Sequence, residues 1–326
     1  MITSFMNKSL NYIDIYRSML FYRRFEEACA KAYSSRLIGG FCHLYIGQEA
    51  VLAAVMQSIK PNDSMITSYR CHAHMIAIGV EPKFIMAELF GKETGTSKGK
   101  GGSMHLFSSE KKFFGGHGIV GAQVPLGTGL AFADRYLNKD NISIVSFGDG
   151  ALNQGQVYES FNMASLFGLP VVYILENNKY SMGTSNDRAI ANCAEINKRA
   201  EAFAIKCYEV KNGMDFFELN DVISESFDYC RKNKKPIFIN INTYRYRGHS
   251  MSDPAKYRSK EELENYKKID PILSMYDYII SNKIANESKI ENIEAEISKI
   301  VEDAYNFALE SSEPSIKELH TDIYCN

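Results

Sequence analysis

Ile142-Ser-Ile-Val-Ser-Phe-Gly-Asp-Gly150 is the stretch that decides the fold, because it joins an apolar strand to an aspartate between two glycines. A helix is expected from about Gln156 to Phe167, and a second apolar strand, Val171–Leu175, then runs into Glu176-Asn177-Asn178. Two strands joined through a helix lie parallel, and their right-handed connection brings both carboxyl ends to one edge of the sheet. The sequence therefore predicts an α/β fold with a mostly parallel sheet and helices on both faces.

These two strand ends carry oxygen ligands. Asp149 offers a carboxylate, Asn178 offers an amide oxygen, and the backbone carbonyl of Tyr180 lies close in sequence. Magnesium prefers a few protein oxygens completed by phosphate oxygens. Gly148 and Gly150 allow the backbone to approach a polyanion, and the helix that follows adds free N–H groups. The spacing therefore predicts a site for Mg²⁺ and a diphosphate.

A second glycine motif suggests a dinucleotide site instead. Gly116-His-Gly118-Ile-Val-Gly121 fits the pattern G-x-G-x-x-G, which must follow a buried strand and precede an acidic residue at the end of another strand. The preceding Lys111–Gly115 segment is expected to be too short and polar for such a strand, and Asp134 falls inside the next helix. We therefore expect these glycines to bring a loop against the ligand.

Composition excludes several classes of function. The chain has 326 residues, with 37 Lys and Arg against 39 Asp and Glu, so its net charge of −2 provides no basic field for nucleic acid. No run approaches the ~20 apolar residues needed to span a bilayer. The seven cysteines form no C-x-x-C pair, which favours reduced thiols. A bacterial cytoplasmic enzyme is expected, and a processed mitochondrial form is the alternative.

The rest of the chain predicts one domain over 1–326, with its core at about 40–250. Apolar residues recur at helical spacing near both ends, so helical extensions are expected at about 9–35 and 259–310. The glycine-dense stretch 91–121 is expected to be a functional loop. Further elements are expected at 49–59, 70–78, 82–90, 124–136 and 215–231 as helices and at 237–241 as a strand.

Three polar clusters complete the candidate site. They are Phe41-Cys-His43, Tyr69-Arg70-Cys-His72-Ala-His74 and the segment Tyr244–Pro254, which contains His249. A single histidine is more often a structural residue than a catalyst, and His72 and His74 cannot share a helix face to bind zinc. Tyr69 and Arg70 could hold a phosphate. Arg245 and Arg247 would reach one face if the preceding strand continues through them.

Together these segments resemble the alpha subunit of the decarboxylating component of pyruvate dehydrogenase, from about residue 10 to residue 320. The segments that carry the resemblance are Gly40–Ala50, Gly99–Phe107, Gly115–Gly127, Gly148–Gln156, Glu176–Ser185 and Thr243–Pro254. The resemblance implies a thiamine diphosphate-binding fold. It also implies that Asp149, Asn178 and the Tyr180 carbonyl hold Mg²⁺, and that His43 and His249 are catalytic. The implied cofactor contacts are His43, Tyr69, Arg70, Gly118, Val120, Asp149, Gly150, Ala151, Asn178, Tyr180 and His249.

The same resemblance implies a reaction and its partners. The reaction is oxidative decarboxylation of pyruvate with reductive acetylation of the lipoyl group of a dihydrolipoyl acetyltransferase. The glutamate that activates the thiamine ring would lie on a beta subunit, so an alpha2-beta2 heterotetramer is expected and the isolated chain is expected to be inactive. Arg245, Arg247 or His249 would guide the lipoyl arm. Ser185 and Ser250 match two positions that are phosphorylated in eukaryotic relatives, and a third such serine is absent.

Other functions stay open from the sequence. An acetoin or branched-chain 2-oxoacid dehydrogenase alpha subunit would use the same cofactor chemistry. A non-catalytic scaffold would have no need for Asp149, Asn178 and His249 together, and a nicotinamide-binding domain would depend on Gly116–Gly121 alone.

Overall fold

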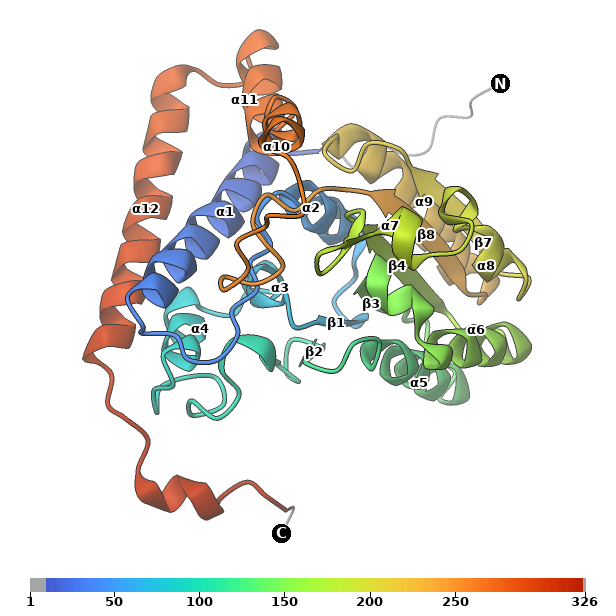
Figure 1. Ribbon diagram of the computed structural model, residues 1–326, viewed down its shortest axis with the longest axis horizontal. Coiled ribbons are helices and arrows are strands. Elements are labelled where there is room, and N and C mark those ends of the chain that lie inside the picture. Colours follow the sequence, from blue (N-terminus) through green and yellow to red (C-terminus); the bar gives the residue numbers. More distant parts are fainter. Residues whose placement is uncertain (1–9, 325–326) are drawn as a thin grey trace.

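The computed structural model describes residues 10–324, and it contains a parallel sheet between layers of helices (Figure 1). The strand order in the sheet is β2-β1-β3-β4-β8-β7, and every described pair in it is parallel. The strands are β1 (Ser64–Ser68), β2 (Phe113–His117), β3 (Ser143–Gly148), β4 (Val171–Asn177), β7 (Lys206–Val210) and β8 (Ile237–Asn242). The predicted α/β class is therefore confirmed.

Each face of the sheet is covered by its own helices. Side chains alternate across a strand, so Ile144 of β3 packs in one apolar core while Val145 and Phe147 pack in the other. The first core includes α2 (Glu49–Ser58) and α9 (Phe216–Asn233). The second includes α5 (Gln123–Tyr136) and α6 (Gly155–Phe167). Both strands named at the outset are thus buried on two faces, which explains their unbroken apolar sequence.

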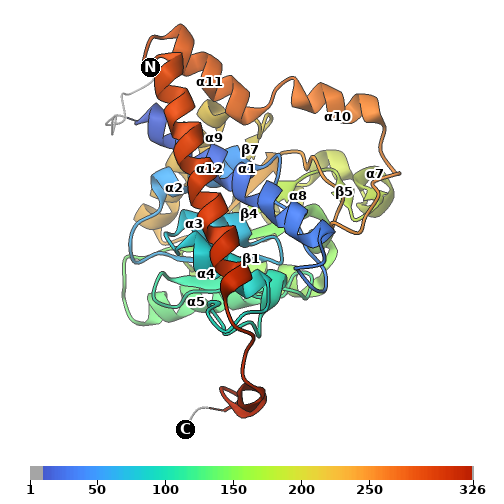
Figure 2. The ribbon, with the colours of Figure 1, turned by 90° about the vertical axis from the view of Figure 1, so that its left-hand side faces the viewer.

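Helices from the two ends of the chain lie together at one side of the sheet (Figure 2). The long helices α1 (Tyr12–Ser34) and α12 (Glu287–Glu310) are in contact, and α12 also packs on α4 (Pro82–Leu89). Ile290, Ile293, Ile297 and Ile300 were expected to form one apolar stripe of this helix; the first three are buried and Ile300 is half-buried. The segment before it forms α10 (Lys260–Lys267) and α11 (Pro271–Ser281). Residue 9, where the N-terminal extension was expected to begin, and Cys325 lie outside the described residues.

Short elements connect these layers. They are α3 (His72–Ala77), η1 (Gly102–Met104), η2 (Asp149–Asn153), β5 (Tyr180–Ser181), β6 (Thr184–Ser185), α7 (Asn186–Ala189), η3 (Cys193–Glu195), α8 (Lys198–Glu201) and η4 (Ile316–His320). Among the helices of residues 10–324, none is both long enough and apolar enough to cross a membrane. The extent of the domain, 1–326, stays a prediction.

The glycine-rich stretch corrects one expectation. Lys111–Gly115 was expected to be too short and polar for a strand, but Phe113–His117 forms β2, with Phe113 fully buried. An edge strand has only one neighbouring strand in its sheet, and for β2 this neighbour is β1. Asp134 does lie inside α5, as expected, so the acidic residue of a dinucleotide motif is still out of place. The strands β1 and β7 were not predicted.

Candidate functional site

Except for His43, which lies in the loop before α2, the predicted site residues follow five neighbouring strands, β2, β1, β3, β4 and β8, at the carboxyl edge of the sheet. Gly148 at the end of β3 pairs with Glu176 of β4, and Asn177 of β4 pairs with Asn242 at the end of β8. This register places Asp149 and Asn178 just beyond adjacent strand ends, as the crossover predicted. Ligands bind in this position in open parallel sheets.

Asp149 is a buried carboxylate in which only one of the two oxygens is hydrogen-bonded. The Asp149 residue is only 2% exposed to solvent. Oδ1 accepts a hydrogen bond from the N–H of Gly150 at 2.9 Å, while buried Oδ2 has no hydrogen-bond partner among the described residues. Burial raises the pKa of Asp149 to about 6, and the N–H of Gly150 only partly offsets this. A divalent cation would satisfy the free oxygen and favour the ionised form, so Asp149 fits a metal ligand.

Asn178 and Tyr180 lie beside this carboxylate because the β5 hairpin packs against η2, which begins at Asp149. The Asn178 Oδ1 accepts hydrogen bonds from the Tyr180 N–H at 3.3 Å and from Arg245 Nη1 at 3.4 Å. Arg245 also donates to the Tyr257 hydroxyl at 3.1 Å, so it keeps a partner if a cation takes the Asn178 oxygen. The donor set of carboxylate, amide oxygen and carbonyl is one that Mg²⁺ accepts.

Three rings from different segments form the opposite side of the candidate site. The His43 ring lies 4.2 Å from the Tyr69 ring and 5.1 Å from the His249 ring, measured between centroids. Buried Arg70 fixes their backbones, since it donates to the Leu44 carbonyl at 2.5 Å and to the His249 carbonyl at 2.9 Å. The segments around Leu44, Arg70 and His249 are far apart in the sequence, and they therefore meet at the Arg70 guanidinium.

Burial keeps both histidines uncharged. Desolvation, followed by the nearby Arg70 cation, lowers the pKa of His43 to about 2 and that of His249 to about 3. At neutral pH each imidazole therefore has one nitrogen that accepts a hydrogen bond or a proton. The His249 Nε2 lies 3.4 Å from the Tyr69 hydroxyl, and the buried His43 Nδ1 has no hydrogen-bond partner among the described residues.

The glycine positions bring backbone close to side chains of the site. A Cβ on Gly150 would lie 2.8 Å from the Ser181 Oγ, and one on Gly118 would lie 3.1 Å from the His105 ring. The Val120 carbonyl accepts a hydrogen bond from Gln156 Nε2 at 3.3 Å, which places the turn of Gly118 next to the start of α6. Ala151 is buried in η2. Both glycine segments thus reach the region of Asp149.

The model of the dehydrogenase E1 component family matches residues 17–317. The chain belongs to the dehydrogenase E1 component family. The pyruvate dehydrogenase E1 component subunit alpha of Rickettsia bellii is 56% identical, over 96% of this chain and 95% of its own length. The protein of the same name from Rhizobium meliloti is 53% identical, over 95% of this chain and 89% of its own length. The mitochondrial protein of Dictyostelium discoideum is 45% identical over 96% of this chain.

The structure adds polar residues to the E1 family site that the sequence did not single out. Glu176 is buried, and it accepts a hydrogen bond from the Tyr45 hydroxyl at 2.5 Å. Burial raises the pKa of Glu176 to about 7. Asn186 donates to the Asn177 Oδ1 at 2.7 Å and so supports the second strand end. The only sequence signal for Glu176 was a carboxylate at the end of an apolar strand.

The structure decides a conditional expectation about the loop after β8. Arg245 and Arg247 would share a face only if the strand continued through them, and β8 ends at Asn242. Arg245 is buried against Asn178, while Arg247 is exposed. Ser250 is also buried, and its hydroxyl lies 2.9 Å from that of Ser252. A phosphate on Ser250 would therefore require this loop to open.

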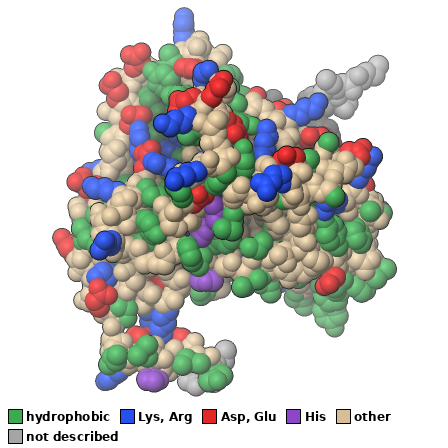
Figure 3. Space-filling model, viewed as in Figure 1, with side chains coloured by type: hydrophobic (Ala, Val, Ile, Leu, Met, Phe, Trp, Pro, Cys, Tyr) green, Lys and Arg blue, Asp and Glu red, His purple; other side chains and the backbone are tan. Residues whose placement is uncertain are grey.

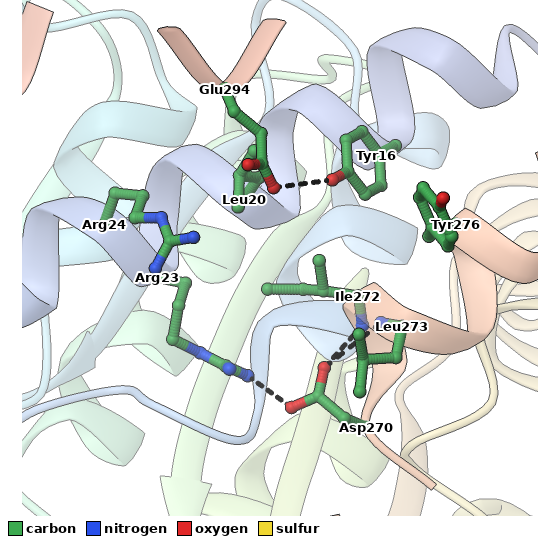
Figure 4. A pocket seen from close by; sticks show the side chains of 9 residues that line it. All are labelled: Tyr16, Leu20, Arg23, Arg24, Asp270, Ile272, Leu273, Tyr276 and Glu294. Atoms are coloured by element: carbon green, nitrogen blue, oxygen red, sulfur yellow. Dashed lines mark hydrogen bonds and ion pairs between the residues drawn. The ribbon is translucent and has the colours of Figure 1, made fainter. Parts of the chain in front are cut away.

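One hollow lies away from the residues of the candidate site. This cavity has a volume of about 330 Å³. Figure 4 shows the side chains that line it, which come from α1 and the C-terminal helices: Tyr16, Leu20, Arg23, Arg24, Asp270, Ile272, Leu273, Tyr276 and Glu294. Within it Arg23 donates to Asp270 at 3.0 Å and Tyr16 donates to Glu294 at 3.3 Å. Histidine side chains instead reach the surface near the middle of the face in Figure 3.

Proposed function

We propose that this chain is the alpha subunit of a thiamine diphosphate-dependent pyruvate dehydrogenase component. It would decarboxylate pyruvate oxidatively and acetylate the lipoyl group of a dihydrolipoyl acetyltransferase, in the cytoplasm of a bacterium. The relatives' names support the substrate. The observation that carries the proposal is the free, buried oxygen of Asp149 beside Asn178 at two adjacent strand ends.

The proposed binding roles follow from the donor atoms. Asp149, Asn178 and the Tyr180 carbonyl would hold Mg²⁺. Gly118, Val120, Gly150 and Ala151 would line the diphosphate, with Tyr69 and Arg70 supplying polar contacts across the pocket. When bound, thiamine diphosphate supplies a carbon nucleophile and an electron sink for decarboxylation.

His43 and His249 would handle protons at the mouth of the pocket. Both imidazoles are neutral at physiological pH because burial and Arg70 disfavour their charged forms. The His249 Nε2 beside the Tyr69 hydroxyl can therefore accept a proton or donate one, according to its tautomer. Exposed Arg247 on the same loop would attract an anionic or lipoyl-bearing partner.

The proposal also includes assembly with a second subunit. Figure 3 shows apolar side chains gathered over the end of the molecule where α5 and α6 lie. The exposed apolar residues of these helices are Leu126, Phe132, Tyr136, Met163, Leu166 and Phe167. An apolar patch of this kind marks an interaction site. Two glutamates lie in the segments that carry the resemblance at this site: Glu49 is engaged by Arg23 at 2.5 Å and by the Gly47 N–H at 3.0 Å, and Glu176 accepts the Tyr45 hydroxyl at 2.5 Å. The activating carboxylate would therefore come from a beta subunit.

The proposal is tested on the chain co-expressed with its beta subunit. Calorimetry should detect thiamine diphosphate binding in the presence of Mg²⁺, and Asp149→Ala should weaken it by on the order of 100-fold because the metal loses its carboxylate ligand. Asp303→Ala removes an exposed carboxylate of α12 and serves as the control. Equal binding by wild type and Asp149→Ala would refute the metal site.

The substrate is tested on the same complex. Turnover of pyruvate should exceed that of 3-methyl-2-oxobutanoate and of acetoin. A complex without preference for pyruvate would instead be the acetoin or branched-chain enzyme. Activity of the purified chain without a beta subunit would contradict the proposed assembly.

A further inference from the structure

One buried hydrogen-bond network joins four separate segments of the sequence. Glu26 Oε2 on α1 lies 2.9 Å from His72 Nδ1 on α3, and His72 Nε2 lies 2.8 Å from the Ser103 hydroxyl in η1. The other carboxylate oxygen, Oε1, accepts the Tyr45 N–H at 3.0 Å. Glu26, His72 and Ser103 are all buried. Such bonds are strong and directional because water does not compete for them.

Two of the contacts lie two residues from a position in the candidate site, and the third lies two residues from a histidine that packs against such a position. Tyr45 follows His43 by two residues, and His72 follows Arg70 by two residues. Ser103 precedes His105 by two residues, and the His105 ring lies against Gly118. The network therefore holds the backbone close to His43, close to Arg70, and close to the contact between His105 and Gly118.

Some of these atoms lie close enough together for a metal site, but their bonding argues against one. The ligand atoms of Glu26, Cys29 and His72 lie within 4.8 Å of one another. However, both carboxylate oxygens of Glu26 and both ring nitrogens of His72 already have hydrogen-bond partners. Burial also raises the pKa of the Cys29 thiol, which disfavours the thiolate that a metal requires.

We propose that Glu26 is a positioning residue for the reaction, acting through His72 and Ser103. His43 and Arg70 lie outside the strands and helices, so no regular backbone ladder fixes their positions and side-chain hydrogen bonds contribute to holding these loops. A shift of about 1 Å in such groups costs on the order of 100-fold in rate. The carboxylate of Glu26 sets the spacing between these loops. This inference rests on the proposed function, since it concerns the same pocket.

Three variants of Glu26 and its helix test the proposal in the alpha–beta complex. Glu26→Ala removes both bonds, and Glu26→Gln can rebuild them, since its amide oxygen accepts from Tyr45 and its NH₂ donates to the other His72 tautomer. Met19→Ala, at another fully buried position of α1, controls for lost packing. We expect Glu26→Ala to weaken thiamine diphosphate binding about 10-fold and to lower kcat on the order of 100-fold. Glu26→Gln should restore both values to within about 3-fold of wild type.

Two further measurements keep the test decisive if Glu26→Ala does not fold. Ser103→Ala breaks only the last bond, and it should weaken cofactor binding several-fold without lowering Tm beyond the loss in Met19→Ala. Amide hydrogen exchange in 43–47 and 101–105 should speed up in the Glu26 and Ser103 alanine variants but not in Met19→Ala.

The outcomes separate this inference from the proposed function. A wild-type complex that binds no thiamine diphosphate would overturn the function itself. Cofactor affinity and exchange in Glu26→Ala or Ser103→Ala that match Met19→Ala would overturn the positioning role while leaving the function intact.

Discussion

Burial sets the charge of the main side chains in the candidate site. It raises the pKa of Asp149 to about 6 and lowers the pKa of His43 to about 2 and that of His249 to about 3. Desolvation is the leading cause in each case, because a charge in a low-dielectric pocket loses its hydration. The carboxylate therefore gains from a bound cation, while the two imidazoles stay neutral opposite it.

Gly150 provides a test of close packing at the residue scale. In Gly150→Ala the new Cβ would lie 2.8 Å from the Ser181 Oγ and 3.0 Å from its Cβ. We expect the free energy of unfolding to fall by about 1–3 kcal/mol, as in other overpacked sites. Gly148→Ala is the control, because nothing lies within 4 Å of its new Cβ. Denaturant unfolding measures both, and an equal loss in the two variants would contradict this packing.

His74 provides a pH prediction outside the candidate site. It is buried beside Tyr45 and Phe113, and burial lowers its pKa to about 3. The unfolded chain binds this proton below pH ~6.5 and the folded chain does not, so stability falls as the pH decreases through that window. The contribution between pH 7.5 and pH 5 is about 2 kcal/mol.

His74→Phe should therefore flatten the acid side of the stability profile, measured by urea unfolding at several pH values. The slope should not vanish, because the depressed pKa values of His43 and His249 act in the same direction. A profile as steep as that of wild type would show that His74 is not the group that titrates.

At the scale of elements, one carboxylate on α4 organises the glycine-rich loop. Glu88 is 0% exposed, and it accepts four backbone hydrogen bonds, from the N–H groups of Ser97, Gly99, Gly101 and Gly102 at 2.7–3.1 Å. The outer side of the loop is held by Lys98 and Lys100, which pair with acids near the C-terminus. Buried hydrogen bonds to a charged group contribute about 1.5–3 kcal/mol each, whereas exposed ion pairs are screened by solvent and contribute little. The Glu88 carboxylate therefore contributes more to holding this loop than the lysine ion pairs do.

Glu88→Ala should therefore open this loop. Trypsin should cleave after Lys98 and Lys100 at least about 10-fold faster in the variant, because local opening becomes less costly. Glu81→Ala removes an exposed acid from the start of α4, where it pairs only with Lys83, and should leave cleavage unchanged. Unchanged cleavage in Glu88→Ala would mean that the lysine pairs hold the loop.

At the scale of the whole molecule, two of its sides differ in character. The terminal helices α1, α11 and α12 lie on one side, and α5 and α6, which cover one face of the sheet, lie on another (Figure 1). Apolar side chains of α5 and α6 are exposed to solvent. Phe132 of α5 and Phe167 of α6 pack edge to face with centroids 5.7 Å apart, and both stay about half exposed. A preformed aromatic pair on an apolar patch is typical of an interface.

Leu166→Glu should therefore weaken assembly with the beta subunit. Leu166 is 72% exposed on α6, so a charge there costs the isolated chain little but would be buried in an interface. Leu273→Glu, on α11 and 58% exposed, is the matched control. Size-exclusion chromatography with light scattering should show loss of the complex only for Leu166→Glu. Equal assembly by both variants would place the interface elsewhere.

Much of this arrangement was predictable from local sequence. The β3–α6–β4 crossover needs only two apolar runs separated by one helix, so the proximity of Asp149 and Asn178 followed from chain geometry. The edge strand β2 was missed because its glycines and lysines resemble a loop, and one neighbouring strand was enough to order it. Glu88 and Glu26 were missed because a buried carboxylate on a helix resembles a solvent-facing one until its partners are known.

The sequence by itself determined the α/β class, the family resemblance and the strand ends that carry Asp149 and Asn178. These depend on periodicity and short spacings along the chain. Only the tertiary structure decided which distant segments meet: His43 beside Tyr69 and His249, and Glu26 behind them. The physical reason is that such contacts depend on how loops close over the sheet, and their hydrogen bonds leave no periodic pattern in the sequence.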